Sequence, residues 1–110
     1  MTRGKPLRLR EPAERDLLSA FEHYVKDAPQ VASHFIDAFE EARSCLERQP
    51  AIGSPRYAEP LQMPGLRSWA LTGFPYLLFY VERAEYLEGI RLLHQRADIP
   101  AWLQDEGSAP

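Results

Sequence analysis

The chain of 110 residues contains a single cysteine, Cys45, and only two lysines. One cysteine cannot form an internal disulfide, so the fold must rest on its hydrophobic core, as is usual in a reducing compartment. No segment approaches the roughly 20 consecutive apolar residues that span a membrane. The basic start of the chain is not followed by the apolar stretch of a signal peptide. We therefore expect a cytoplasmic protein with no membrane partner.

The sequence also lacks the motifs that mark common enzyme and cofactor sites. It has no C-x-x-C pair, no phosphate-binding loop and no dinucleotide fingerprint, and no serine stands in a G-x-S-x-G turn. His23 and His34 are eleven residues apart, which is not a spacing that metal ligands use. The net charge is −3, and the isoelectric point of about 5.6 is unlike that of most nucleic-acid-binding proteins. A local basic patch stays compatible with this charge, but we expect no metal, no cofactor and no direct specific binding of nucleic acid.

What the sequence does contain is a clear order of amphipathic segments. Residues 6–10 alternate apolar and polar side chains, which predicts a short, half-buried strand. Apolar residues at helical spacing predict two helices, from Pro12 to the break at residues 27–29 and from there to about Arg48. The connection between them is short, so they should form an antiparallel hairpin.

Three further strands are predicted after a loop rich in proline and glycine. The loop occupies residues 50–65, and the strands cover residues 66–71, 76–81 and 86–95. This order predicts an α+β fold, β-α-α-β-β-β, in which the two-helix hairpin packs on a small, mostly antiparallel sheet. The first strand should return as an edge or near-edge strand, and the other face of the sheet should stay free for use.

The length fits one domain with one core. We expect that domain to cover residues 1–103. Residues 104–110 are polar, small or proline and are expected to form a flexible tail.

Polar side chains gather where the last predicted strand ends: Arg91, His94, Arg96 and Asp98. Strand alternation sends Arg91 and His94 to opposite faces unless the strand ends or bulges between them. Two interpretations of Arg91 stay open. It either forms a small cationic site with Arg67 on the open sheet face, or it pairs with Glu88 or Glu82 and merely solvates that face.

The residues after this strand suggest a structural role for Asp98. Its carboxylate is well placed to cap a short helical turn over residues 99–103. Histidine is the usual general base near neutral pH, but no nucleophile with a paired base accompanies His94. The sequence therefore gives catalysis by His94 no support.

Five segments of the chain form an ordered set of motifs. Residues 9–17 read L-R-E-P-A-E-R-D-L, residues 49–53 read Q-P-A-I-G, and residues 65–67 read G-L-R. Residues 74–80 read F-P-Y-L-L-F-Y, and residues 90–98 read I-R-L-L-H-Q-R-A-D. In this order they resemble the A-x-x-D-L, P-x-x-G, G-[VL]-R, F-P-Y-x-[IL]-x-Y and closing I-x-R-[VI]-L-H-x-x-[RM]-D segments of the ParE/RelE superfamily. These are toxins of bacterial toxin–antitoxin modules, and the ParE branch is the more similar.

The resemblance extends from residue 7 to about residue 103 and implies the fold argued above. It also implies a partner, because ParE-like toxins are held inactive by a ParD-like antitoxin whose C-terminal segment wraps around them. The helical hairpin and the edge strand would offer an apolar groove and unpaired backbone to that segment. The residues expected to bind the antitoxin are Phe21, Tyr24, Phe35 and Phe39. The acidic surface of the helices favours a partner with basic residues.

Two activities occur in the superfamily that this chain resembles. ParE-like members are similar to poisons of DNA gyrase, whereas RelE-like members cleave mRNA on the ribosome with several basic residues on the sheet. A nuclease must stabilise developing negative charge with several aligned cations, and here the sheet offers few. We therefore expect the toxin of a plasmid-stabilising type II module that inhibits gyrase by protein–protein contact, without bond chemistry of its own. An mRNA interferase is the alternative, and a non-toxic orphan binding module is a third.

The functional surface is expected to comprise Arg67, Arg91, His94, Arg96, Asp98 and Trp102. Within it, Arg96 and Asp98 should end the sheet and aim residues 100–103 outward as a docking element.

Overall fold

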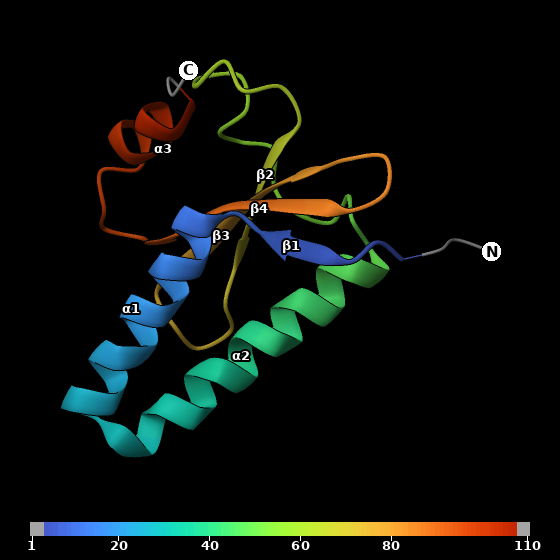
Figure 1. The fold of residues 1–110 in the computed structure, drawn as a ribbon. Coiled ribbons are helices and arrows are strands. Elements are labelled where there is room, and N and C mark those ends of the chain that lie inside the picture. Colours follow the sequence, from blue (N-terminus) through green and yellow to red (C-terminus); the bar gives the residue numbers. More distant parts are fainter. Residues whose placement is uncertain (1–3, 108–110) are drawn as a thin grey trace.

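The computed structural model of the protein describes residues 4–107, and the side chains of residues 4–103. Its elements are β1 (Leu7–Leu9), α1 (Glu11–Asp27), α2 (Pro29–Arg48), β2 (Leu66–Ala70), β3 (Tyr76–Glu82), β4 (Leu87–His94) and α3 (Ile99–Gly107) (Figure 1). The predicted β-α-α-β-β-β order is confirmed. A third helix, α3, follows it, and the backbone of this helix extends into the segment expected to be a tail. No helix in the described part of the chain is long and apolar enough to cross a membrane.

Two prolines define the helical hairpin. Pro12 lies in the first turn of α1 and Pro29 in the first turn of α2, where a missing N–H costs no hydrogen bond. Ala28 alone separates the two helices, and its N–H donates to the carbonyl of Tyr24. This tight connection makes the helices antiparallel neighbours, as predicted.

The sheet has the strand order β1-β4-β3-β2. β1 runs parallel to β4, and the other two pairings are antiparallel. β1 is thus an edge strand in a mostly antiparallel sheet. Gly89 allows its close approach, because a Cβ at this position would lie 2.5 Å from the Leu9 side chain.

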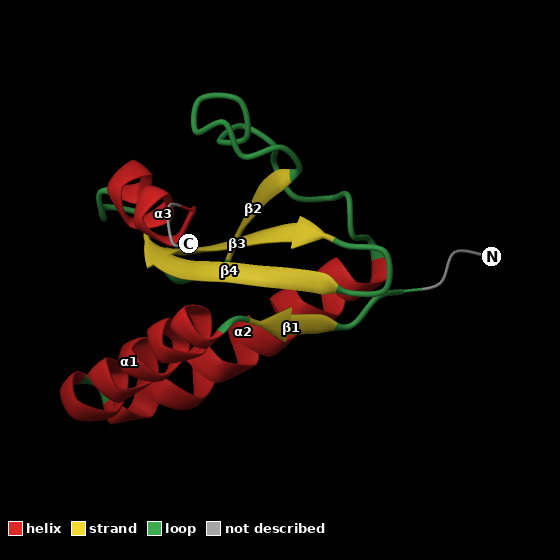
Figure 2. Ribbon diagram, turned by 45° about the horizontal axis from the view of Figure 1, so that its top comes forward, coloured by secondary structure: helices red, strands yellow, loops and turns green. Residues whose placement is uncertain are grey.

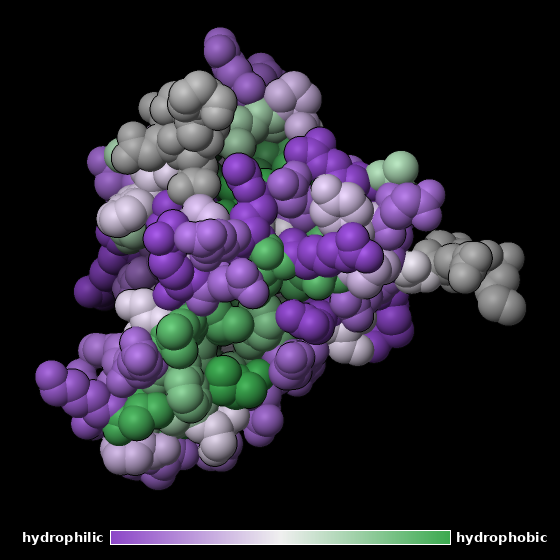
Figure 3. Space-filling view, viewed as in Figure 1, coloured by the Kyte–Doolittle hydropathy of each residue, from purple (hydrophilic) through white to green (hydrophobic). Residues whose placement is uncertain are grey.

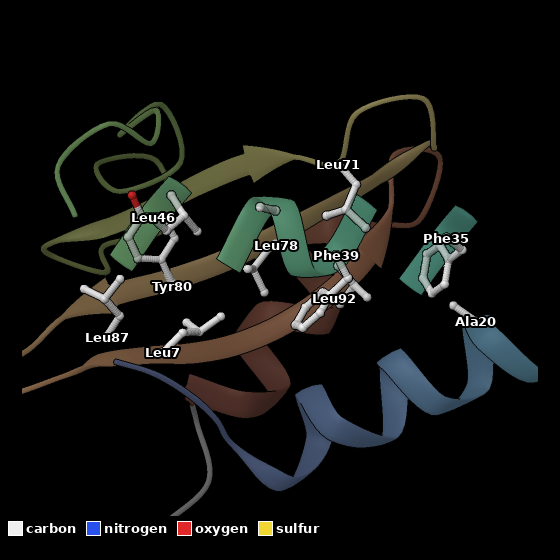
Figure 4. Packing of buried hydrophobic residues seen from close by; sticks show 11 residues of the cluster. Leu7, Ala20, Phe35, Phe39, Leu46, Leu71, Leu78, Tyr80, Leu87 and Leu92 are labelled. Atoms are coloured by element: carbon white, nitrogen blue, oxygen red, sulfur yellow. The ribbon is translucent and has the colours of Figure 1, made fainter. Parts of the chain in front are cut away.

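The two faces of the sheet are both covered (Figure 2). The inner face packs on α1 and α2 through the inner cluster, which includes Phe35, Phe39, Leu46, Leu78 and Leu92 (Figure 4). The outer face carries a second cluster: Leu66, Phe79, Val81, Ile90, Leu93, Ile99 and Leu103. Apolar side chains of the loop at residues 57–63 pack against this outer cluster.

The expectation of a free outer face is therefore wrong. β3 and β4 are apolar on both faces, so the outer face also has to be removed from water. Ile99 and Leu103 of α3 cover one end of it, and the loop covers another part.

The loop is anchored to the sheet by Tyr80. The Tyr80 hydroxyl donates to the Pro50 carbonyl at 2.7 Å and accepts from the Gly53 N–H at 3.0 Å. A Cβ at Gly53 would lie 2.5 Å from that hydroxyl oxygen, so only glycine fits there. Burial raises the pKa of Tyr80, which keeps the hydroxyl protonated and able to donate. Pro50 and Gly53 of the P-x-x-G motif thus supply the two backbone hydrogen-bond partners of the buried Tyr80 hydroxyl.

Candidate functional site

A β-bulge interrupts β4 just before its arginine. Phe79 is opposite Arg91, but the next residue of β3, Tyr80, is opposite Gly89, so Ile90 is the extra residue. Ile90 packs in the outer cluster, and Leu92, only two residues later, packs in the inner cluster. The bulge therefore shifts the alternation between Ile90 and Arg91. From Arg91 to His94 the pairing with β3 is regular, so these two residues start from opposite faces, as predicted, and they come together only where the sheet ends. Both line one cleft.

The partner of Arg91 is Asp16 of α1, which neither interpretation of the sequence anticipated. Nε of Arg91 donates to one Asp16 carboxylate oxygen at 2.6 Å, and Nη2 donates to the other at 2.8 Å. The backbone N–H of Leu92 donates to the same carboxylate at 3.0 Å, beyond the point where β1 stops pairing with β4. Only 7% of Arg91 is exposed. This is a bidentate ion pair in a desolvated position, the strongest geometry for such a pair.

Arg67 and Glu88 are engaged elsewhere. Nη1 of Arg67 donates to the Gly53 carbonyl at 2.7 Å and helps to hold the loop. Glu88 accepts two hydrogen bonds from Arg83, at 2.9 and 2.6 Å. Arg67 and Arg91 thus each serve contacts within the chain rather than a shared open cationic site.

The turn after β4 is built as the sequence predicts for Asp98. Its Oδ1 accepts from the Ala101 N–H at 3.4 Å, and its carbonyl accepts from the Trp102 N–H at 3.1 Å, so Asp98 caps α3. Nδ1 of His94 accepts from the Arg96 N–H at 3.0 Å. The ring of His94 also packs edge-on against Tyr76, with centroids 5.3 Å apart. Arg96 itself is exposed on this turn.

Trp102 lies on the first turns of α3 with 47% of its surface exposed. The guanidinium carbon of Arg91 is 5.0 Å from the centre of its ring, within the range of a cation–π contact. One ion-paired arginine therefore links α1, β4 and α3.

These elements enclose a cleft of about 460 Å³, here called the α1–α3 cleft. Its polar and aromatic lining includes Asp16, His23, Tyr76, Arg91, His94 and Trp102. Three of the six residues predicted for the functional surface thus come together in it. Asp98 caps the adjoining helix, Arg96 lies on the adjoining turn, and Arg67 belongs to the loop anchor.

Asp16 is the main residue of this cleft that the sequence analysis missed. A signal was present, because Asp16 is three residues after Ala13 and four before Ala20, and both alanines are buried. A carboxylate on the buried face of a helix requires a partner. The sequence did not say which of the basic residues supplies it.

Several titratable groups of the cleft are engaged in contacts within the chain. The Asp16 carboxylate is already occupied by Arg91, and burial, followed by the neighbouring Tyr24, raises the pKa of Tyr76. Ser19 also lines the cleft, but within the described residues it has no hydrogen bond to a histidine. No three His, Cys, Asp or Glu residues in residues 4–103 lie together so as to hold a metal ion.

A second hollow, the α1–α2 groove, lies on the helical hairpin. It has a volume of about 310 Å³ and is lined by the apolar side chains of Leu9, Leu17, Leu18, Phe21 and Ile36, with Glu14 and Arg43 beside them. Figure 3 shows the apolar band that follows the seam between the two helices. Leu18, one of the lining residues, is 56% exposed, so the groove has an apolar side chain open to solvent.

The residues predicted to bind an antitoxin divide between this groove and the core. Phe21 lines the groove, and Tyr24 is half-buried beside Phe35, with ring centroids 5.2 Å apart. Phe35 and Phe39 are only 0% and 2% exposed. They belong to the inner cluster and offer no surface to a partner, since a helix facing both sheet and hairpin buries its largest side chains.

Comparison with known proteins agrees with these features. Residues 7–99 match the family described as the ParE toxin of the type II toxin–antitoxin system parDE. The chain belongs to the ParE toxin family. Its fold is similar to a chain of the solved structure named "Chromosomal ParDE TA system from P. aeruginosa", with a TM-score of 0.69 and 20% sequence identity. That similarity covers 84% of this chain and 98% of the other. No curated protein gives a significant match.

Membership confirms the resemblance seen in the five motifs, and the protein is a type II toxin of a toxin–antitoxin module. In this ParE toxin, α1 contributes to both hollows. Asp16 lines the α1–α3 cleft, and the next two residues, Leu17 and Leu18, line the α1–α2 groove.

Proposed function

We propose that this ParE toxin inhibits DNA gyrase by protein–protein contact and is neutralised by a ParD-like antitoxin. The antitoxin is supported by the family itself, whose description names the parDE system. The similar solved structure likewise comes from a ParDE system. A role in plasmid stabilisation would follow from such a module.

The observation that carries the choice of gyrase over mRNA is the internal pairing of the sheet arginines. Cleavage of RNA needs several aligned cations to stabilise the charge that develops on phosphorus. Arg91 is held by Asp16, Arg67 by the Gly53 carbonyl and Arg83 by Glu88. The outer sheet face is covered as well. The described part of the chain thus favours a toxin that acts by contact.

The α1–α3 cleft is the surface that we assign to the target. Trp102 stands half exposed at its margin, and a partly exposed tryptophan beside a cleft is the kind of anchor that dominates binding energy in protein interfaces. His94 contributes to the same surface, and Arg96 and Asp98 flank it. Arg67 is not included, because it holds the loop.

The α1–α2 groove is the surface that we assign to the antitoxin. Its apolar lining suits the apolar face of an amphipathic helix. The outer edge of β1 lies beside α2, where the Leu7 N–H already donates to the Glu47 carboxylate at 2.6 Å, so we assign the groove and not this edge to the antitoxin. Acidic residues outnumber basic ones by nine to four in residues 11–48, which favours a basic antitoxin segment.

Expression of the toxin alone in bacteria tests this proposal. We expect growth arrest with induction of the DNA-damage response, relief by the co-expressed antitoxin, and loss of toxicity in Trp102→Ala. Rapid mRNA cleavage without DNA breaks would contradict the proposal and select the mRNA interferase. Harmless overexpression of folded protein would instead select the orphan binding module.

A further inference from the structure

We infer that Asp16 is a positioning residue for target binding: acting through Arg91, it holds Trp102 in place at the margin of the α1–α3 cleft. This inference rests on the proposed function, because it concerns how the surface assigned to the target is held. It gives a role to Asp16 of α1, which lines the cleft, whereas the proposed function named residues of β4, α3 and the turn between them.

The first step is the fixing of the guanidinium. Both carboxylate oxygens of Asp16 accept from Arg91, one from Nε at 2.6 Å and the other from Nη2 at 2.8 Å. The guanidinium is therefore held at two points and cannot rotate freely. The Leu92 N–H, at 3.0 Å, fixes the carboxylate in turn. An arginine side chain has many rotamers, and the bidentate contact with a fixed carboxylate selects one of them.

The second step is the contact of Arg91 with the indole. The guanidinium carbon is 5.0 Å from the ring centre of Trp102. Ile99 and Leu103 hold α3 on the outer cluster, but they leave the Trp102 side chain itself half exposed. Arg91 is thus the described support for the ring on the cleft side, and a flat cation under an aromatic face sets the ring orientation.

The third step is what happens without the carboxylate. A buried guanidinium that loses the Asp16 carboxylate loses two charge-assisted hydrogen bonds, so it moves toward its remaining acceptors or toward water. Either movement takes the cation from beneath the indole. Trp102 then becomes more mobile and more exposed, and a target that needs an ordered tryptophan binds more weakly because the side chain must be ordered on binding.

The test uses purified toxin in which Trp102 is the only tryptophan. The chain has two tryptophans, so Trp69→Phe provides this parent. In that parent, Asp16→Asn is compared with Glu22→Gln, an equal loss of charge at an exposed position of the same helix. Two quantities are measured for each, normalised to the folded fraction: quenching of Trp102 fluorescence by acrylamide, and the concentration that half-inhibits DNA supercoiling by gyrase.

We expect Asp16→Asn to increase the quenching of Trp102 and to raise the half-inhibitory concentration at least fivefold. Glu22→Gln should leave both within twofold of the parent, and Asp16→Glu should recover part of both losses. If Asp16→Asn does not fold, Arg91→Lys carries the same test, because it keeps the charge beside Asp16 but removes the flat cation.

Unchanged quenching in folded Asp16→Asn would overturn the inference, whether or not inhibition falls, since Asp16 would then act independently of Trp102. Increased quenching with unchanged inhibition would also overturn it. A parent toxin that does not inhibit gyrase at all would instead refute the proposed function, while the quenching would still show whether Asp16 positions Trp102.

Discussion

Arg91 is the one charged residue that is buried in the described part of the chain. Its burial is tolerable because the Asp16 carboxylate supplies a counter-charge and accepts hydrogen bonds from both Nε and Nη2. We expect Arg91→Ala to lower the free energy of unfolding by about 3–5 kcal/mol, since Asp16 is left partly buried without a counter-charge. Urea denaturation followed by circular dichroism measures this.

Arg83→Ala is the matched control for that substitution. Arg83 pairs with Glu88 at 2.6 Å, but its side chain is 49% exposed, so its loss should cost no more than about 1 kcal/mol. Equal effects of the two substitutions would show that the Asp16–Arg91 pair is not a buried anchor.

Tyr80 is the second residue on which the fold depends. In Tyr80→Phe the Gly53 N–H and the Pro50 carbonyl lose their shared partner, so we expect a loss of about 1–3 kcal/mol. The same denaturation experiment at neutral pH measures it. An unchanged free energy of unfolding in Tyr80→Phe would mean that water takes the place of the hydroxyl.

The tyrosines also determine how stability depends on alkaline pH. Burial raises the pKa of Tyr24, Tyr76 and Tyr80 above their ordinary value of 10.0. As the pH rises, the tyrosines of the unfolded chain therefore lose their protons before those of the folded chain. The stability that the protonated tyrosines contribute is intact below about pH 10 and is lost as the pH rises through their folded-state pKa values. We expect the free energy of unfolding to fall above about pH 10, less steeply in Tyr80→Phe. A flat profile up to about pH 11 would contradict this.

At the scale of elements, α1 carries the exposed apolar residues that we assign to the antitoxin. Leu18→Glu places a charge in the α1–α2 groove, and we expect at least a tenfold loss of antitoxin affinity with little change in the toxin's own stability. Val25→Glu makes the same change on the same helix, at a 46% exposed residue that is not part of the groove lining. Isothermal titration with the antitoxin distinguishes them, and an equal loss in both would remove the groove from the interface.

Among the described side chains of α3, Ile99 and Leu103 pack on the sheet. Leu103 is fully buried in the outer cluster, and Leu103→Ala should cost about 2–5 kcal/mol and weaken gyrase inhibition by loosening Trp102. The exposed Ala101→Ser is the control and should change neither quantity measurably. Inhibition that survives in Leu103→Ala would argue against α3 as the target surface.

The helical hairpin and the Asp98 cap are parts of the fold that could be predicted from the sequence. The helical hairpin was predictable because Pro12 and Pro29 mark its helix starts and because the apolar spacing is helical. The capping role of Asp98 was predictable from a local rule, and the structure confirms it. These features depend on neighbours within a few residues.

The cleft was harder to predict because it depends on contacts between distant segments. The bulge at Ile90 follows Gly89, a residue type that often marks bulges but does not fix their place, and it reverses the face on which Leu92 and His94 lie. The Asp16–Arg91 pair joins residues 75 positions apart. The covering of the outer face was also missed, although the apolar character of Phe79, Val81 and Leu93 on that face called for it.

At the scale of the whole molecule, two hollows of different character share one helix. The α1–α2 groove is apolar and lies on the hairpin, whereas the α1–α3 cleft is lined by ion-paired, aromatic and imidazole groups. A toxin with two such surfaces can bind its antitoxin and its target through separate contacts. A bound antitoxin can then inhibit the toxin by sterically blocking the target or by shifting α1. The Leu18→Glu variant in the groove and the Asp16→Asn variant in the cleft together distinguish these two mechanisms.

The central claim is inhibition of gyrase by contact, and a supercoiling assay with purified components tests it most directly. Purified toxin should stop supercoiling of relaxed plasmid by gyrase at a stoichiometric excess, Trp102→Ala should not, and added antitoxin should restore supercoiling. Undiminished supercoiling in the presence of folded toxin, together with toxin-dependent cleavage of mRNA on purified ribosomes, would contradict the account.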